Sequence, residues 1–307
     1  MPEVPDTAFA TIALIGAPNA GKSTLLNRLV GTKVAIVTHK AQTTRSVLTG
    51  ISVNNSTQLA FIDTPGIFAG RKSLDRAMVA AAWRSLGRAD IVVLLVPAFG
   101  RARQQSEMIL DDLVQRRSAG QHCLLVINKI DRVKKPDLLS LVAEFSRACD
   151  FDSVFMISAL NGDGVNDLYD WMAASAEPGK WPYDPDQLID ASSAFAACEI
   201  TREKLLLRLH QELPYRLTVE TEEWTDAPDG SLTIRQLIYV ERISHKKMVI
   251  GARGQTIKEI GMQARRDIAA LLGRDVKLFL RVKERSNWME ESARYAPMGL
   301  EHPGGHA

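Results

Sequence analysis

The segment from Gly16 to Ser23 reads Gly-Ala-Pro-Asn-Ala-Gly-Lys-Ser and fits the pattern G-x-x-x-x-G-K-[ST]. Glycines at these positions let backbone N–H groups turn inward around phosphates, and the start of a following helix adds the positive end of its dipole. Lys22 can reach the outer phosphates, and the Ser23 hydroxyl can ligate Mg²⁺. The apolar run Thr11–Ile15 precedes the segment, and the helical pattern Lys22–Val30 follows it. This context predicts a phosphate-binding loop.

A second motif, Asp63-Thr64-Pro65-Gly66, follows the apolar run Leu59–Ile62. A carboxylate at the carboxyl end of such a strand lies where the metal of a phosphate-loop site is held. Gly66 would offer a backbone N–H near the terminal phosphate. Alone, the tetrapeptide is a plausible turn. After a phosphate loop, the metal-binding interpretation is favoured.

A third motif, Asn128-Lys129-Ile130-Asp131, follows the apolar run Cys123–Ile127. The carboxylate can accept two hydrogen bonds, from the N1–H and the exocyclic amino group of guanine, and adenine lacks donors in that arrangement. A mismatched base would leave a buried charge unpaired, so we expect strong discrimination. The alternative is a charged loop end in which Asp131 caps a helix. Ser158-Ala159, after the next strand, could contact the guanine oxygen through its backbone.

In this order, the three motifs resemble the GTP-binding domain of translation-factor-like GTPases. The resemblance implies that Asp131 reads guanine, Asn128 braces the base and its pocket, Lys129 packs on the base and the Ala159 N–H points to it. The predicted GTP-binding residues are Gly16, Ala17, Pro18, Asn19, Ala20, Gly21, Lys22, Ser23, Thr24, Asp63, Thr64, Pro65, Gly66, Ile67, Asn128, Lys129, Asp131, Ser158 and Ala159.

The resemblance also implies a switch segment at Gln42-Thr43-Thr44-Arg45, in which a threonine hydroxyl joins Mg²⁺. Thr44 is preferred because it directly precedes Arg45, and Thr43 is the alternative. Without the other motifs this stretch would be an ordinary polar loop. The predicted metal ligands are Ser23, Thr44 and Asp63.

No catalytic residue is assigned. Where Ras-like enzymes carry a glutamine that orients the attacking water, this chain has Ile67. An aliphatic side chain cannot orient water, so we expect unassisted hydrolysis to be slow, at about 10⁻⁴ s⁻¹ or below. Hydrolysis would then act as a timer that a partner accelerates.

A separate motif, Gly251-Ala252-Arg253-Gly254, joins two helical patterns. Two glycines spaced in this way allow close approach of a sugar–phosphate backbone, as in the GXXG loop of a KH domain, which holds about four nucleotides of single strand. A lone G-x-x-G is usually a turn, but here basic residues flank it. The predicted RNA-binding residues are Lys246, Lys247, Ile250, Gly251, Ala252, Arg253, Gly254, Lys258 and Arg265.

Charge is unevenly distributed along the chain. The 307 residues carry a net charge of +2, which does not suggest a nucleic-acid partner. The window from Ser244 to Arg285, however, holds 11 basic and 4 acidic residues, a net charge of +7, whereas Trp181 to Ile243 has 6 basic and 12 acidic residues, a net charge of −6. The binding charge is therefore concentrated around the G-x-x-G motif.

Alternating apolar and helical patterns must position the first three motifs, and they predict an α/β fold with a mostly parallel sheet and helices on both faces. The predicted strands are Thr11–Ile15, Leu48–Val53, Leu59–Ile62, Ile91–Val96, Cys123–Ile127 and Val154–Ile157. The predicted helices are Lys22–Val30, Ser73–Leu86, Gln104–Arg117, Leu138–Cys149 and Val165–Ala174.

Beyond a proline-rich stretch the order becomes helix, strand, strand, helix, helix, strand, which predicts an α+β domain of the type II KH arrangement. Its expected elements are a helix over about Ala191–Leu213, strands over Tyr215–Trp224, Leu232–Val240 and Val276–Val282, and two helices flanking the G-x-x-G. We expect a GTP-binding domain at residues 1–177, a linker at 178–190, a KH domain at 191–298 and a disordered tail at 299–307.

Several other classes are disfavoured. Three dispersed cysteines, Cys123, Cys149 and Cys198, predict neither a zinc site nor a disulfide framework. The start of the chain lacks the basic and apolar parts of a signal peptide, and the run Ile91–Val96 is far too short to span a membrane. We therefore expect a cytoplasmic protein, at most peripheral on a membrane, and a monomer.

The motifs together resemble the Era family of bacterial ribosome-assembly GTPases. The resemblance covers nearly the whole chain and includes Glu212-Leu213-Pro214-Tyr215 and the run Lys246 to Gly251. It departs at Ala20, where valine is usual, and at Ala252-Arg253, where base preference could shift. It implies binding near the 3′ end of small-subunit rRNA on the assembling small ribosomal subunit, with Mg²⁺ and GTP, and peripheral association with the inner membrane.

The resemblance further implies that GTP favours exposure of the RNA groove, that RNA stimulates hydrolysis and that GDP favours release. Two other functions remain open from the sequence. One is a membrane or cell-cycle signalling adaptor whose KH domain binds protein. The other is a GTP-dependent tRNA-modification factor, although such proteins usually carry other domains and a C-terminal cysteine.

Overall fold

The computed structural model describes residues 7–38, 40, 43–70, 72–210 and 213–304. Residues of the chain form two compact units. The first comprises Met1–Ala35, Thr44–Asp190 and Met298–Ala307, and the second comprises Ile36–Thr43 and Ala191–Pro297. Two residues of the sequence motifs, Gln42 and Glu212, lie outside the described residues.

The first unit is built on a sheet in the order β2-β3-β1-β4-β5-β6, with β7 pairing to β1. All pairings are parallel except β2 with β3 and β7 with β1. The strands are β1 (Ala8–Ile15), β2 (Leu48–Asn54), β3 (Thr57–Asp63), β4 (Ile91–Pro97), β5 (His122–Asn128), β6 (Ser153–Ile157) and β7 (Glu177–Pro178).

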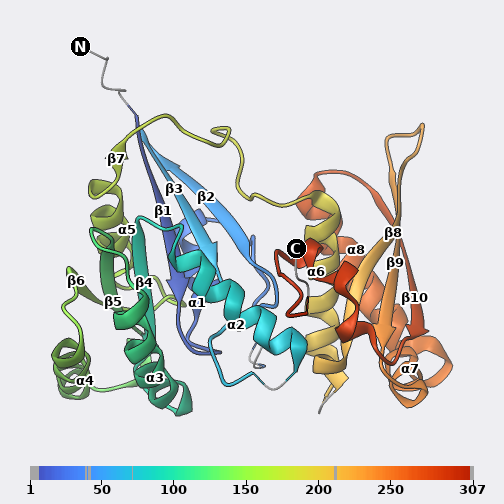
Figure 1. Cartoon of the computed structure of the whole chain (residues 1–307). Helices are drawn as coiled ribbons and strands as arrows, with labels where there is room; N and C mark the ends of the chain where they lie inside the picture. The colour runs from blue at the N-terminus through green and yellow to red at the C-terminus, as the bar shows by residue number, and fades with distance from the viewer. Residues whose placement is uncertain (1–6, 39, 41–42, 71, 211–212, 305–307) are drawn as a thin grey trace. The chain divides into compact units, whose positions relative to one another are not determined.

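Helices cover both faces of this sheet, as Figure 1 shows. The helices α2, α3 and α4 pack with β1, β4 and β5 in one apolar core, and α1 and α5 contact β2, β3 and β6. The helices are α1 (Lys22–Val30), α2 (Ser73–Leu86), α3 (Arg101–Arg116), α4 (Lys135–Ala148) and α5 (Val165–Ala174), with the 3-10 turn η1 (Ile130–Arg132). Because both faces are covered, central strands such as β4 are apolar throughout and wholly buried.

The second unit is an α+β layer. Its sheet has the order β10-β9-β8, in which β8 is antiparallel and β10 parallel to β9. Its main elements are α6 (Ser193–Arg208), β8 (Leu217–Asp226), β9 (Leu232–Val240), α7 (Ile243–Ile250), α8 (Gln255–Leu272) and β10 (Val276–Glu284). The helices α6 and α8 pack on the sheet through two apolar clusters. Short 3-10 turns complete it: η2 (Leu213–Arg216), η3 (Ala252–Gly254), η4 (Trp288–Glu290), η5 (Ser292–Arg294) and η6 (Ala296–Met298).

The expected α/β fold followed by a KH arrangement is the one the structure has, and most element boundaries agree within three residues. The first helix of the second unit is an exception. It ends at Arg208 instead of Leu213, because Leu209 is already extended (φ −90°, ψ 154°) and Pro214 lies in a separate 3-10 turn. No helix within the described ranges is long and apolar enough to cross a membrane.

The domain boundaries predicted from sequence need correction at three places. The expected linker, 178–190, belongs to the first unit: Gly179 N–H donates to the Thr7 carbonyl (2.8 Å), and Ile51 N–H donates to the Leu188 carbonyl (2.9 Å). Backbone pairing, which the proline-rich composition hides, holds it there. The segment Ile36–Thr43, assigned to the first domain, groups with the second unit.

The third correction concerns the tail. It was expected to be disordered from residue 299, but its first residues pack on the first unit. Leu300 is buried, Val47 N–H donates to the Met298 carbonyl (3.1 Å), and Glu301 pairs with Arg84 (3.0 Å). The proline and glycines that follow favour the prediction of disorder, and the composition does not show that Leu300 is buried.

Candidate functional site

The phosphate loop follows β1 directly and ends in α1. Gly16 (φ +151°) and Gly21 (φ +105°) have backbone conformations that side chains rarely adopt. A Cβ at Gly16 would lie 2.4 Å from the Leu95 carbonyl oxygen, and one at Gly21 would lie 2.3 Å from Asn128 Nδ2. Both positions therefore require glycine. Lys22 is buried, and its Nζ donates to the carbonyl oxygens of Gly16 (3.1 Å) and Ala17 (3.2 Å).

Three oxygen-bearing side chains converge beside this loop. The Ser23 hydroxyl donates to Asp63 Oδ2 (2.6 Å) and lies 2.8 Å from the Thr44 hydroxyl, and Thr44 Oγ1 lies 3.5 Å from the same carboxylate oxygen. They come from the start of α1, the end of β3 and the segment before β2. The structure thus brings together all three predicted metal ligands. Hydroxyl and carboxylate oxygens are the hard donors that Mg²⁺ prefers.

Burial makes the charges of this cluster costly. It raises the pKa of Asp63 to about 6, against the opposing effects of Lys22 and the hydroxyl donors. It also lowers the pKa of Lys22 to about 8, against the attraction of Asp63. Asp63 Oδ1 is buried and has no hydrogen-bond partner among the described atoms. A buried acceptor left in this way favours a bound cation, so the donor set fits Mg²⁺.

The two candidate threonines differ in their surroundings. Thr43 Oγ1 lies 2.6 Å from the Thr38 hydroxyl and donates to the Lys40 carbonyl (2.8 Å), so it serves the fold of its own segment. Thr44 is the one that faces Ser23 and Asp63. The geometry supports the choice of Thr44 over Thr43 as metal ligand.

The base-reading motif lies at the end of β5, at the same edge of the sheet. Asn128 Nδ2 donates to the Ala20 carbonyl (2.8 Å), and its Oδ1 accepts from Ala159 N (3.0 Å). Ser158 donates to Asp131 Oδ1 (2.7 Å), which orients that carboxylate. Lys129 Nζ donates to the Asn19 carbonyl (2.6 Å), so it reaches the phosphate loop instead of standing free. These hydrogen bonds join the end of β5 to the phosphate loop and to the residues after β6.

The segment after Asp63 packs against the phosphate loop. A Cβ on Gly66 would lie 2.6 Å from Pro18 N, so glycine permits this approach. The N–H of Ile67 donates to the Gly16 carbonyl (3.1 Å), and its side chain is 5% exposed within the core. Ile67 therefore presents no polar group to a water molecule. Of the remaining residues of the predicted set, Thr24 lies in the first turn of α1, and Thr64 and Pro65 directly follow β3.

The predicted RNA clamp joins α7 to α8. Gly251 (φ +75°), Arg253 (φ +52°) and Gly254 (φ +78°) all have left-handed backbone, which turns the chain sharply between the helices. A Cβ on Gly251 would lie 2.1 Å from Thr256 Oγ1, whereas one on Gly254 would meet nothing within 4 Å. The Ala252 and Arg253 side chains between the glycines are exposed.

Basic residues around the clamp fall into two groups. Five of them form no ion pair within the described part of the chain: Lys246, Lys247, Arg253, Lys258 and Arg265. Arg266, in contrast, pairs with its neighbour Asp267 (3.2 Å). Ile250 is partly buried against the core of the second unit, so it acts as groove wall more than as a free contact.

Sequence reasoning missed several residues near the nucleotide pocket. Phe99, just after β4, makes cation–π contacts with Lys129 and Arg132. Lys129 Nζ lies 5.8 Å from the ring centroid, and the Arg132 guanidinium carbon lies 4.6 Å from it. A phenylalanine followed by glycine carried no motif. Arg202 and Glu203 of α6 also contact the segment Ile36–Thr43. Both charged side chains are buried, and no periodic pattern in the sequence predicts that burial.

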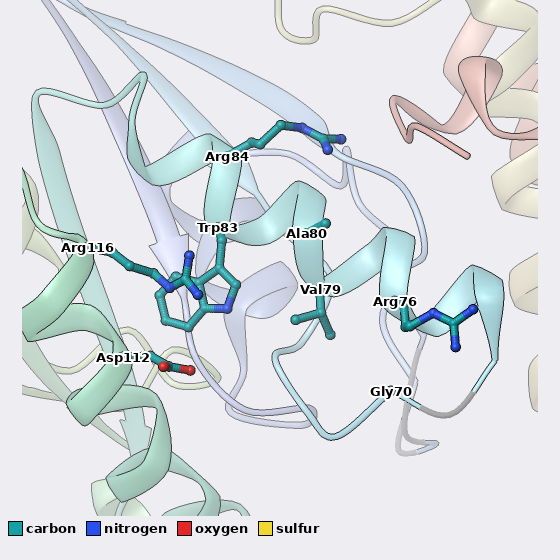
Figure 2. Close-up of a pocket in the computed structure, with 8 residues that line it drawn as sticks. All are labelled: Gly70, Arg76, Val79, Ala80, Trp83, Arg84, Asp112 and Arg116. Atoms are coloured by element: carbon teal, nitrogen blue, oxygen red, sulfur yellow. The ribbon is translucent and has the colours of Figure 1, made fainter. Parts of the chain in front are cut away.

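A separate hollow of about 610 Å³ lies between α2 and α3 (Figure 2). In it the Arg116 guanidinium lies over the Trp83 ring, 5.0 Å from the centroid. It includes none of the predicted nucleotide or RNA residues. Its lining residues are Gly70, Arg76, Val79, Ala80, Trp83, Arg84, Asp112 and Arg116.

Two family models match the chain: a 50S ribosome-binding GTPase over residues 11–129 and a KH domain over residues 212–289. The GTPase Era of Dinoroseobacter shibae is 51% identical over 301 residues, which are 98% of this chain and 98% of that protein. The GTPase Era of Brucella suis is 50% identical over 301 residues, 98% of this chain and 96% of that protein.

Solved structures agree with these matches. A crystal structure of an Aquifex aeolicus Era variant bound to GDP and AlF4⁻ is 33% identical, with a TM-score of 0.89 over 95% of this chain and 99% of that one. One of Era with MgGDPNP and nucleotides 1506–1542 of 16S ribosomal RNA is 32% identical, with a TM-score of 0.88 and the same coverage. The phosphate loop, the two family models and relatives of about 50% identity over nearly the whole chain agree: the chain is a GTPase of the Era family.

Proposed function

We propose that this GTPase is a slowly hydrolysing switch that binds small-subunit rRNA near its 3′ end and acts in assembly and maturation of the small ribosomal subunit. The observation that carries the proposal is the clamp around Gly251 and Gly254, beside which basic side chains form no ion pair with any described residue, in a chain whose solved relative holds nucleotides 1506–1542 of 16S rRNA. Phosphate contacts of this kind supply most of the affinity for nucleic acid.

Mg²⁺ accompanies the nucleotide in this proposal. Ser23, Thr44 and Asp63 would hold it, and the relative that carries MgGDPNP supports the assignment. When bound, the ion neutralises charge on the outer phosphates. The chain's own residues do the rest: the loop amides and Lys22 bind phosphate, and Asp131 and Asn128 fix the base.

Slow hydrolysis follows from Ile67, which is buried and bonded through its backbone to Gly16. The aliphatic Ile67 side chain cannot orient water, so the GTP-bound state would persist until RNA or the ribosomal particle accelerates hydrolysis. GTP would favour RNA binding and GDP release. Linkage then requires that RNA raise the affinity for GTP by the same factor as GTP raises the affinity for RNA.

The test is binding of an RNA that spans nucleotides 1506–1542 of 16S rRNA, compared with a scrambled RNA of equal length. We expect salt-dependent affinity for the native RNA, lost in Gly254→Asp, which places a negative charge in the clamp. Arg265→Gln should reduce the salt dependence by about one counterion, and the matched variant Arg266→Gln should change it little. Equal binding of both RNAs would contradict the rRNA assignment.

The role in assembly is tested in cells. Depletion of the protein should lead to small subunits with unprocessed 3′ ends of their rRNA, rescued by the wild type and not by Gly254→Asp. Normal subunits after depletion would contradict it. We place the protein in the cytoplasm with the assembling subunit, acting as a monomer. Fractionation with vesicles of inner-membrane lipid tests the further proposal of peripheral association.

A further inference from the structure

We propose that Arg202 and Glu203 of α6 are positioning residues for the nucleotide site. They hold the segment Ile36–Thr43, and through it Thr44, so that closure of the metal-ligand set is coupled to the KH domain. The part of the inference that concerns RNA rests on the proposed function. The part that concerns nucleotide binding does not.

The two residues hold opposite ends of the segment. Arg202 Nη2 donates to the Thr43 carbonyl (2.6 Å), and Glu203 Oε1 accepts the Val37 N–H (3.1 Å). Between them, Lys40 Nζ donates to the carbonyl oxygens of Leu206 and Leu209 at the end of α6. All these contacts lie within the second unit. Three described residues of the segment, Val37, Lys40 and Thr43, are therefore each held by α6 or the residue after it.

These are not surface ion pairs. Arg202 is 3% exposed and Glu203 2% exposed. Glu199, one turn earlier, accepts from Arg202 Nε (2.7 Å) and Nη2 (2.6 Å), which fixes the guanidinium before it reaches Thr43. A buried, preorganised donor of this kind contributes more than an exposed one, because its removal leaves partners unsatisfied.

The position of Thr43 gives the contact its consequence. Its carbonyl belongs to the peptide bond that leads into Thr44, whose hydroxyl lies 2.8 Å from Ser23 Oγ. Holding that carbonyl restricts where the Thr44 side chain can lie. Loss of Arg202 would leave the Thr44 hydroxyl free to leave Asp63. The affinity for GTP, whose Mg²⁺ needs Thr44, should therefore fall, and the affinity for GDP should be unchanged.

A chain of charged pairs continues from Glu203 toward the clamp. Glu203 Oε2 accepts from Lys204 Nζ (3.2 Å), and Lys204 also pairs with Asp267 of α8. Helix α8 begins at Gln255, directly after Gly254, and carries Arg265 two residues before Asp267. Helix α8 and the residues before Thr44 thus share one electrostatic network, in which Glu203 and Lys204 are buried and Asp267 is partly exposed.

The first measurement is nucleotide affinity of the full chain, with Mg²⁺, for fluorescent GDPNP and GDP. In Arg202→Gln we expect about tenfold weaker GDPNP binding and unchanged GDP binding, in line with loss of one charge-assisted hydrogen bond. The control is Arg208→Gln on the same helix, whose side chain is half exposed and pairs with Glu259. It should change neither affinity. Unchanged GDPNP binding in a folded Arg202→Gln variant would overturn the inference.

Thermal unfolding monitors the fold of each variant. If Arg202→Gln fails to fold, Arg202→Lys, which keeps the charge but not the forked geometry, is measured in its place with the same expectation. Hydrogen–deuterium exchange of the wild type gives an independent readout. GDPNP should slow exchange of the Val37 and Thr44 amides relative to GDP, and equal exchange in the two states would contradict the proposal.

The RNA arm uses Lys204→Met, which cuts the link between α8 and Glu203. In the wild type, RNA should raise GDPNP affinity, and in Lys204→Met this effect should fall toward onefold while RNA still binds. Retention of the full effect would overturn the coupling through α6. If the wild type binds no RNA, the proposed function fails, and the nucleotide measurements on Arg202 still decide the positioning role.

Discussion

Asn128 Nδ2 donates to the carbonyl oxygen of Ala20 over 2.8 Å and so ties the end of β5 to the phosphate loop. The same side chain accepts the Ala159 N–H through its oxygen (3.0 Å). A single buried amide therefore joins the parts of the site that bind phosphate and base. The phosphate loop and the motif predicted to bind the base are therefore already held together before the nucleotide binds.

Changing Asp131 to asparagine should replace guanine by xanthine as the preferred base. The carboxylate accepts from the N–H donors of guanine, whereas an amide can donate to the extra carbonyl of xanthine. We expect GDP affinity to fall at least about 100-fold and XDP affinity to rise. Titration with fluorescent GDP and XDP checks this. Asp137→Asn, at the exposed start of α4, is the control and should bind GDP normally.

Thr44→Ala and Thr43→Ala should separate the two candidate metal ligands. Only Thr44 faces Ser23 and Asp63, so Thr44→Ala should weaken Mg²⁺-dependent binding of GDPNP by about tenfold, the worth of one polar contact at a charged centre. Thr43→Ala keeps the backbone carbonyl and should have a smaller effect. A larger loss in Thr43→Ala would reverse the assignment.

The clamp glycines should differ in their tolerance of alanine. At Gly251 the new Cβ would lie 2.1 Å from Thr256 Oγ1 and also require φ +75°, so we expect a stability loss of about 2–3 kcal/mol. Gly254 has an ordinary left-handed backbone (φ +78°, ψ 11°, against ψ 176° at Gly251) with nothing within 4 Å, so its variant should lose about 1 kcal/mol. Thermal unfolding of both variants measures the difference, and equal losses would refute the steric argument.

Two of the three cysteines should resist alkylation in the native chain. Burial raises the pKa of Cys123 to about 12 and of Cys198 to about 11. Since the thiolate is the nucleophile, raising the pH from 7 to 9 should leave both thiols protonated and unreactive, whereas an ordinary thiol would ionise. Mass spectrometry after iodoacetamide should find labelling confined to Cys149 until urea is added. Rapid labelling of native Cys123 would contradict the burial.

Local motifs could predict which side chains lie together at this edge of the sheet, because these side chains stand in short segments at strand ends. Lys22–Val30, for example, has the boundaries expected from its pattern, and the edge of a parallel sheet necessarily gathers Gly16, Asp63 and Asn128. The clamp was found for the same reason: two glycines and a positive charge excess stand close together in the sequence.

What the sequence could not predict depends on long-range pairing. Arg202 and Thr43 are 159 residues apart, and nothing in either neighbourhood marks them as partners. The stretch from residue 178 has the composition of a linker, but backbone hydrogen bonds and side-chain hydrogen bonds to distant strands fix it, among them the pairing of Gln58 with Tyr183 and the bond from Trp181 to the Ala8 carbonyl. The composition of a segment indicates its local conformational preference, whereas these contacts depend on residues that are distant in the sequence.

That stretch has one further consequence. β2 is an edge strand, and its outer backbone groups are occupied by the passing chain: Ile51 N–H bonds to Leu188, and Asp190 N–H bonds to Thr49, with a bridge between Gly50 and Ile189. Open edges invite strand addition by other molecules and hence aggregation. The stretch that leads to the KH domain therefore also covers the edge of β2 and protects the sheet against strand addition by other molecules.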